Sequence, residues 1–240
     1  MLKKLAIFLM VPVFSLLIAT SQLAYAETYG GFSLGVSLPH DVNDIKATLG
    51  ADSATATDLS PENAFAYGFK VGHYFKNIPW LGVEFNFYQR DPDVAQQTAT
   101  AVGTLGIFSA AATGQLKVDV NSATTFGLLV MMRATEEQTK NLYNFEPFLG
   151  IGLGLNLVDL GEASTFNAAG VLQTSTNLGS DTSVGILISA GLNYKLTDKI
   201  KAYGEYKYTD SSYELNGSDG VTYEFDSGDS SLMFGIAYGF

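Results

Sequence analysis

LMFGIAYGF, residues 232–240, stands at the C-terminal end of this chain and alternates large apolar side chains with small or slim ones. The large side chains are those of Leu232, Phe234, Ile236, Tyr238 and Phe240. Because successive side chains of a β-strand point to opposite faces, the period of two places all five on one face. A strand needs so continuous an apolar face only where that face meets a core or lipid.

The opposite end of the chain, residues 1–26, has the features of a secretory signal peptide. Lys3 and Lys4 form a positive start, residues 5–19 are mostly apolar, and the small-residue site Ala24-Tyr25-Ala26 precedes Glu27. A retained membrane anchor is the alternative, but the apolar run is shorter than the ~20 residues of a spanning helix. We therefore expect export, cleavage after residue 26 and a mature domain over residues 27–240.

The composition favours strands over helices. The chain holds 25 Gly, 6 Pro, 13 Tyr and 16 Phe, a combination that suits strands and turns. No stretch after the signal peptide reaches the ~18 uninterrupted apolar residues of a membrane helix, so any insertion into a membrane must be by strands. The absence of Cys excludes a disulfide scaffold.

Eight segments alternate apolar residues with small or polar ones, and no boundary separates two domains. They are residues 29–38, 63–75, 80–90, 115–133, 145–158, 182–196, 200–209 and 232–240. The apolar faces carry no Asp, Glu, Lys or Arg. A charge on a lipid-facing position of a barrel costs about 2–4 kcal/mol near the bilayer midplane, so a membrane environment would impose this exclusion.

The second faces of the same segments are polar. Their charged residues are Lys70, Glu84, Arg90, Glu146, Lys195, Glu205 and Lys207. A soluble sandwich or lipocalin-like barrel would turn its apolar faces inward, and these charges would then form its surface. An eight-stranded barrel has just enough interior for side chains to pair, so we expect the apolar faces to point outward and the charges to pack in the lumen.

Connection lengths predict the topology. Residues 76–79 and 197–199 form short turns, and residues 134–144 a moderate connection. The four remaining connections are long, over residues 39–62, 91–114, 159–181 and 210–227. The sequence therefore predicts an all-β fold, an eight-stranded antiparallel transmembrane β-barrel with short periplasmic turns and long extracellular loops. We expect the Gly-, Ser-, Thr- and Ala-rich parts of these loops to be mobile rather than separately folded.

Acidic residues concentrate in the long connections. Removal of Lys3 and Lys4 with the signal peptide leaves 11 basic against 24 acidic residues, and the four connections alone hold 15 acids and one base, Lys46. This balance disfavours nucleic acid as a partner, because nucleic acid needs a basic patch. A solvated acidic surface is the simplest interpretation, with divalent cations or a basic partner as the alternatives.

Together these features resemble the small OmpA-like or opacity-type outer-membrane β-barrel proteins of Gram-negative bacteria. The resemblance rests on the signal peptide, the eight segments, the EYKYTD run at 205–210, the PFLGIGLG run at 147–154 and Phe240. It implies a monomer in the outer membrane, surrounded by lipid and lipopolysaccharide. It also implies that the assembly machinery of the outer membrane recognises Phe240.

Motifs that could carry chemistry are few. Gly150, Gly152 and Gly154 superficially resemble a phosphate-binding loop, but they lie inside a predicted strand, where we expect lumenal glycines to make room for Tyr and Arg. With two His and no Cys, a zinc or redox site is disfavoured. His40 is expected to be an exposed residue at the base of a loop, and His73 an interfacial side chain beside the aromatic girdle. We predict no catalytic residue, no metal ligand and no cofactor.

Three functions remain open at this stage. The first is a non-enzymatic structural or surface-interaction role through the acidic extracellular loops, with a possible extracellular or host ligand. The second is a narrow porin or channel for small or apolar solutes, since lumenal glycines could leave gaps. The third, a lipid A-modifying enzyme, rests on His40 beside Asp41 alone, because no Ser/His/Asp spacing supports it.

Overall fold

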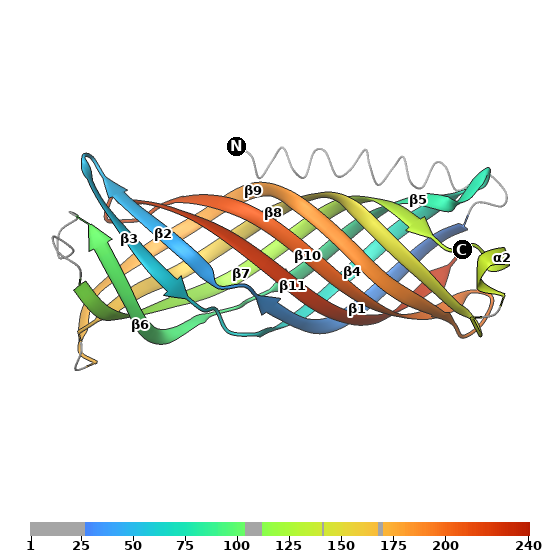
Figure 1. Cartoon of the computed structure of the whole chain (residues 1–240), viewed down its shortest axis with the longest axis horizontal. Helices are drawn as coiled ribbons and strands as arrows, with labels where there is room; N and C mark the ends of the chain where they lie inside the picture. The colour runs from blue at the N-terminus through green and yellow to red at the C-terminus, as the bar shows by residue number, and fades with distance from the viewer. Residues whose placement is uncertain (1–26, 104–111, 141, 168–169) are drawn as a thin grey trace.

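The computed structural model describes residues 27–240, except for residues 104–111, 141 and 168–169 (Figure 1). The predicted signal peptide, residues 1–26, lies outside the described residues. Within the described ranges the chain is almost entirely strand, with one short helix, α2 (Glu136–Thr139), in the 134–144 connection. No helix among these residues is long and apolar enough to cross a membrane.

Eight strands form a closed antiparallel ring, as predicted. They are β1 (Glu27–Pro39), β4 (Ala64–Phe75), β5 (Ile78–Arg90), β7 (Ala112–Arg133), β8 (Phe145–Phe166), β9 (Leu172–Lys195), β10 (Ile200–Asn216) and β11 (Thr222–Gly239). Each strand pairs with the next, and β11 pairs back onto β1 with Ile236 opposite Phe32. The C-terminal residue extends this closure, because the Phe240 amide donates to the Thr28 carbonyl at 2.9 Å.

The large apolar side chains of the ring point outward. Phe234 is 68% exposed and Leu153 61%, and Phe32, Ile151 and Ile236 are likewise more than half exposed. Their small or polar neighbours point into the lumen, where Ser33, Gly154 and Met233 lie. The predicted orientation, apolar outward and polar inward, is confirmed.

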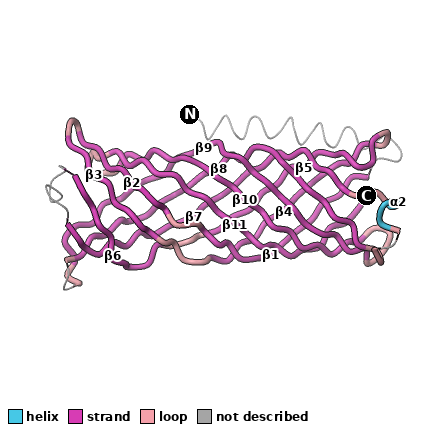
Figure 2. The backbone as a smooth tube through the Cα atoms, viewed as in Figure 1, coloured by secondary structure: helices cyan, strands magenta, loops and turns pink. Residues whose placement is uncertain are grey.

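Within the described residues, the four connections predicted to be long loops are largely strand. The strands continue beyond the ring, and β2 (Val42–Leu49), β3 (Asp52–Leu59) and β6 (Val94–Gly103) extend its wall (Figure 2). β2 pairs with β11 and β3, β3 pairs with β6, and β6 pairs with β7. We call this second half of the barrel, at the left end of Figure 1, the extension.

Proline marks the boundary between ring and extension on one side of the wall. The chain leaves the strand ladder between β1 and β2, between β3 and β4, and between β5 and β6. Pro39 lies at the end of β1, whereas Pro61 and Pro92 lie in the other two breaks. Proline has no backbone N–H and cannot donate to a ladder, so each break falls where one hydrogen bond is already lost.

The polarity of the wall inverts at this boundary. In β11, Leu232 and Phe234 point outward from the ring, but Tyr223 and Phe225 point inward in the extension while Glu224 is exposed. Side-chain direction still alternates along the strand, so it is the chemistry of the two faces that has exchanged. The ring is thus built for lipid outside, and the extension for water outside around an apolar interior.

This inversion predicts that a charge is costly on the outside of the ring and harmless on the outside of the extension. Leu153→Lys should lower the free energy of unfolding in lipid vesicles by about 2–4 kcal/mol. The matched variant Gln173→Lys, at an exposed site of the extension, should stay within about 0.5 kcal/mol of the unmodified protein. Equal losses for the two variants in denaturant titrations would contradict the placement of the lipid boundary.

Candidate functional site

The extension encloses an apolar cavity of about 510 Å³. Its walls are formed chiefly by aliphatic and aromatic side chains from β2, β3, β6, β7, β8, β9, β10 and β11. Buried apolar members of the wall include Val42, Leu59, Val94, Val118, Val158, Leu160, Leu178, Tyr213 and Leu215. Small-molecule sites in proteins are typically apolar cavities of roughly 300–1,000 Å³ with a few polar groups, and this cavity, which we call the vestibule, has that size and lining.

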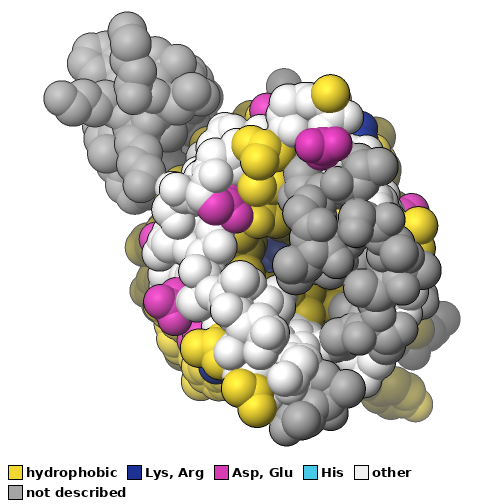
Figure 3. Space-filling model, turned by 90° about the vertical axis from the view of Figure 1, so that its left-hand side faces the viewer, with side chains coloured by type: hydrophobic (Ala, Val, Ile, Leu, Met, Phe, Trp, Pro, Cys, Tyr) yellow, Lys and Arg dark blue, Asp and Glu magenta, His cyan; other side chains and the backbone are white. Residues whose placement is uncertain are grey.

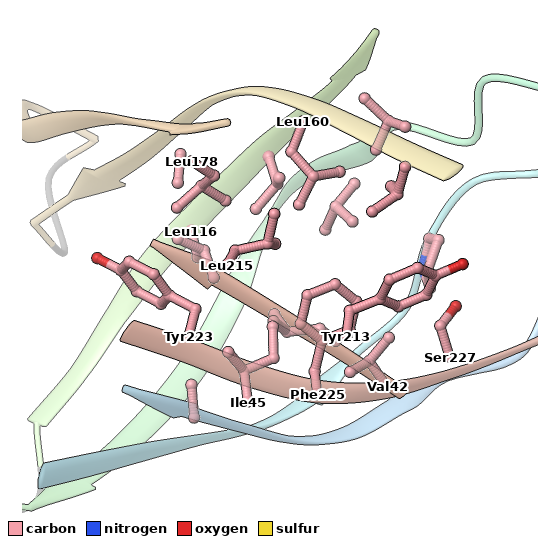
Figure 4. A pocket seen from close by; sticks show the side chains of 18 of the residues that line it. Val42, Ile45, Leu116, Leu160, Leu178, Tyr213, Leu215, Tyr223, Phe225 and Ser227 are labelled. Carbon is pink, nitrogen blue, oxygen red and sulfur yellow. The ribbon is translucent and has the colours of Figure 1, made fainter. Parts of the chain in front are cut away.

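The vestibule is visible from the end of the extension. Figure 3 shows a hollow lined by hydrophobic side chains, with a basic side chain deep inside it. Figure 4 shows the lining side chains of Val42, Leu160 and Leu215 pointing into one shared space from three different strands. Tyr213 and Phe225 pack on each other at the side of this space, with ring centroids 5.4 Å apart.

A polar group stands at the edge of this apolar wall. Asp219 lines the vestibule and accepts hydrogen bonds from the Tyr223 hydroxyl at 3.0 Å and from the Val221 amide at 3.0 Å. Tyr223 lies in the part of β11 above the lipid-facing band. Burial and the hydrogen bond to Asp219 raise the pKa of the Tyr223 phenol, so the phenol remains a neutral donor at physiological pH.

The sequence patterns did not predict the vestibule, because most of its lining residues fall in segments predicted to be loops. A signal was present: Val158 and Leu160, and likewise Tyr213 and Leu215, alternate with polar residues at the strand period. These short apolar pairs sit on the opposite face from the apolar residues of the ring. The period of two therefore continues through the predicted loops with its polarity exchanged.

A layer of four buried charges crosses the ring below the vestibule. Lys70, Glu84, Glu205 and Lys207 are each at most 4% exposed, and we call them the charged layer. Glu205 accepts from Lys70 and from Lys207 at 3.0 Å each, and Lys70 also lies 3.7 Å from Glu84. Hydroxyl and amide groups also donate hydrogen bonds to these carboxylates. Ser189 donates to Glu205, and Tyr29 and Asn86 donate to Glu84.

Two further sets of ion pairs lie above and below this layer. Toward the vestibule Arg90 pairs with Asp229 at 3.3 Å, and toward the short turns Glu27, Glu146, Arg133 and Lys201 form a second cluster. Together with the charged layer these pairs join five basic and five acidic side chains, so the paired lumen carries no net charge. The predicted lumenal pairing is confirmed, although Lys195 is only half-buried at the end of β9.

The charged layer separates the vestibule from a second cavity. The lower cavity, about 670 Å³, is lined by Glu27, Tyr29, Lys201 and other mainly polar or aromatic residues. No described residue lines both cavities. Fully buried side chains, among them Tyr88 and Leu187, fill the space between them together with the charged layer. The charged layer and these buried side chains therefore lie between the two cavities.

His40 has a partner that its sequence neighbourhood did not reveal. Its Nε2 lies 2.9 Å from the Ser230 hydroxyl, which in turn lies 2.7 Å from the Tyr206 hydroxyl. The His40 side chain is exposed, as expected. The expected neighbour Asp41 makes no hydrogen bond to His40 among the described contacts, and no carboxylate is seen on its Nδ1. The arrangement is a serine–histidine contact without the third group that orients the base in hydrolases.

Two other predicted positions are resolved by the structure. His73 lies on the outward register with its Nδ1 2.9 Å from the Thr28 hydroxyl and its ring against Phe75. The glycines at 150 and 152 do make room in the lumen, but the groups that approach them are Met131 and the strand β7 at Leu128 and Leu129, not Tyr and Arg as predicted. Across the described ranges no group of three His, Cys, Asp or Glu is placed to hold a metal ion.

The charged layer should be far more sensitive to truncation than a surface pair. Glu205→Ala leaves Lys207 buried without its carboxylate and Lys70 with only the more distant Glu84, and we expect a loss of about 3–5 kcal/mol in the free energy of unfolding. Glu224→Ala removes an exposed partner of Lys46 at 3.8 Å, and should cost less than about 1 kcal/mol. Denaturant titration in lipid vesicles measures both. A small effect at Glu205 would mean that water reaches the layer.

The comparison with family models agrees with this architecture. The sequence matches the family described as outer membrane protein beta-barrel domain over residues 12–240. Among solved structures, the chain is similar to the outer membrane protein OprG from Pseudomonas aeruginosa (16% identity, 90% of this chain and 95% of that chain covered, TM-score 0.47). It is also similar to Neisserial surface protein A, NspA (15% identity, 90% and 99% covered, TM-score 0.47), and to the outer membrane protease OmpT from Escherichia coli (11% identity, 89% and 97% covered, TM-score 0.50).

A comparison with curated proteins finds no match. The OmpT structure indicates a shared fold alone, since an identity of 11% does not transfer an activity. The family match covers the whole described chain. The closed ring leaves no unpaired strand edge, the apolar band faces outward and the lumenal charges are paired, and a β-protein in a membrane requires these features. The chain belongs to the outer membrane protein beta-barrel domain family and is a transmembrane β-barrel of the Gram-negative outer membrane.

Proposed function

We propose that this protein binds a small apolar molecule in the vestibule, at the extracellular side of the outer membrane, without catalysing a reaction. The observation that carries the proposal is the inverted polarity of the extension, which surrounds about 510 Å³ with aliphatic and aromatic side chains. If the extension only held the connections away from the lipid, its inner face would not need to be apolar. Burial of each additional Leu- or Val-sized apolar group gives about 1.5–3 kcal/mol, which makes an apolar ligand a favourable occupant.

The charged layer between the two cavities supports binding rather than open passage. A porin needs a hydrated path, whereas here the charged layer is buried and its charges are mutually paired. An apolar molecule in the vestibule would also have to cross this layer to reach the lower cavity, at the cost of displacing ion pairs. We therefore propose that the vestibule is an open binding cup above a barrel that the charged layer closes.

A surface-interaction role is the second candidate, and one observation favours it. An outer groove about the ends of β2, β9, β10 and β11 gathers five acidic side chains and one basic one. The groove includes Asp44, Lys46, Asp181, Glu214, Glu224 and Asp226. A basic macromolecule would be steered to this face, with an association rate that falls as salt rises.

Binding of an apolar fluorescent probe tests the first proposal. In lipid nanodiscs, which avoid competition by detergent, N-phenyl-1-naphthylamine should bind saturably with one site per barrel. Ala163→Phe places a ring in the vestibule wall and should weaken binding at least tenfold. Leu128→Phe, on the lipid-facing side, should bind like the unmodified protein. Only the unsaturable partition that empty nanodiscs show would overturn the proposal.

Conductance distinguishes the cup from a pore. In planar bilayers the unmodified protein should give no steady ion current, because the buried and mutually paired charged layer lies across the lumen between the two cavities. The double variant Lys207→Ala/Glu205→Ala removes side chains from that layer and should raise the frequency of open events. A steady current through the unmodified protein would favour the porin instead.

A further inference from the structure

One charged side chain stands at the floor of the vestibule. Arg90 is the last residue of β5, is 6% exposed, and is the single basic residue among the described residues that line the cavity. The walls above it are apolar. A buried guanidinium at the closed end of an apolar cup is costly unless its donors are used, so its hydrogen bonds decide what the floor can accept.

The donors of Arg90 are only partly used by the protein. Nη1 donates to the Thr125 hydroxyl at 3.2 Å, and the guanidinium lies over the Tyr88 ring at 5.1 Å. Nε is 3.3 Å from an Asp229 oxygen, close enough for an ion pair, but the contact lacks hydrogen-bond geometry, and Nε has no hydrogen-bond partner among the described atoms. A guanidinium has five N–H donors and Arg90 lines the cavity, so the donors not used in these contacts give it hydrogen-bonding capacity there.

Asp229 does not depend on those donors. It is 3% exposed and accepts hydrogen bonds from the hydroxyls of Ser37 and of Ser231, the latter at 2.7 Å. Its negative charge nevertheless balances that of Arg90, so the floor is neutral overall. A ligand that accepts a hydrogen bond without adding a charge suits such a floor, because the paired charges of Arg90 and Asp229 give no net attraction that would offset the desolvation of an anion or a cation.

The acidic residues on the outer face of the extension also argue against an anionic ligand. Asp44, Asp181, Glu214, Glu224 and Asp226 lie on the outside of the extension, and they disfavour the approach of anions. We infer that the ligand of the vestibule is an elongated apolar molecule with an uncharged oxygen acceptor, such as a ketone or ester carbonyl, at one end, which accepts a hydrogen bond from Arg90. This inference rests on the proposed function, since it names the class of molecule that the cup takes.

A chain-length-matched series tests it. 2-Decanone, decane, decanoate and decylamine would each compete with the bound naphthylamine probe in nanodiscs, with lipid partition of each competitor measured in empty nanodiscs and subtracted. 2-Decanone should compete about tenfold better than decane, because one hydrogen bond to a charged donor is gained. Decanoate and decylamine should compete less well than 2-decanone.

The control variant replaces Arg90 and Asp229 together, so that neither buried charge is left without its partner. In Arg90→Met/Asp229→Asn, decane should compete as before while the advantage of 2-decanone disappears. Retained probe binding shows that the variant has folded with its vestibule intact.

The outcomes separate the two claims. Equal competition by 2-decanone and decane, stronger competition by decanoate, or a ketone advantage that survives in the double variant would each overturn the role of Arg90. Those results would leave apolar binding standing. Failure of the probe to bind the unmodified protein saturably would instead overturn the proposed function itself.

Discussion

The need to pair every backbone N–H and C=O in a medium without water governs this structure. An open edge in lipid leaves groups unsatisfied at several kcal/mol each, so the first and last strands must meet. β1 and β11 do so over eleven residue pairs, from Tyr29 opposite Gly239 to Pro39 opposite Asp229. Once the ring is closed, side-chain alternation gives each strand one face to the lipid and one to the lumen, and the burial of lumenal charge follows from that geometry.

Proteins in membranes and proteins in water place their apolar residues on opposite sides of a barrel wall, and this chain does both in succession. The change occurs near Pro39, Pro61 and Pro92, where three strands leave the ladder. Above them the wall lies in water, so a polar exterior and an apolar interior are the stable arrangement. The vestibule is a consequence of continuing a narrow barrel out of the lipid.

The lumen of the ring is polar rather than apolar, because the strands of the ring alternate and their large apolar residues face the lipid. Five basic and five acidic side chains neutralise one another, and hydroxyl and amide groups satisfy the remaining acceptors. Such a network contributes to the specificity of the fold more than to its stability. Removing one member leaves its partner buried without a counter-charge, which costs several kcal/mol. It also gives the vestibule a floor, which is why apolar binding and closure against ions go together in the proposed function.

The alternation of single strands was enough to determine the ring, the lipid-facing side chains and the lumenal position of Lys70, Glu84 and Glu205, because the strand period is local and the membrane excludes charge from one face. Sequence patterns did not identify the vestibule. Most of its apolar residues come in short runs, such as Tyr213 and Leu215, which do not stand out among Gly, Ser and Thr. Only the pairing of eight distant segments brings them around one cavity. Tertiary structure alone likewise set Arg90 against Asp229, since the two lie far apart in the chain and meet only when the barrel closes.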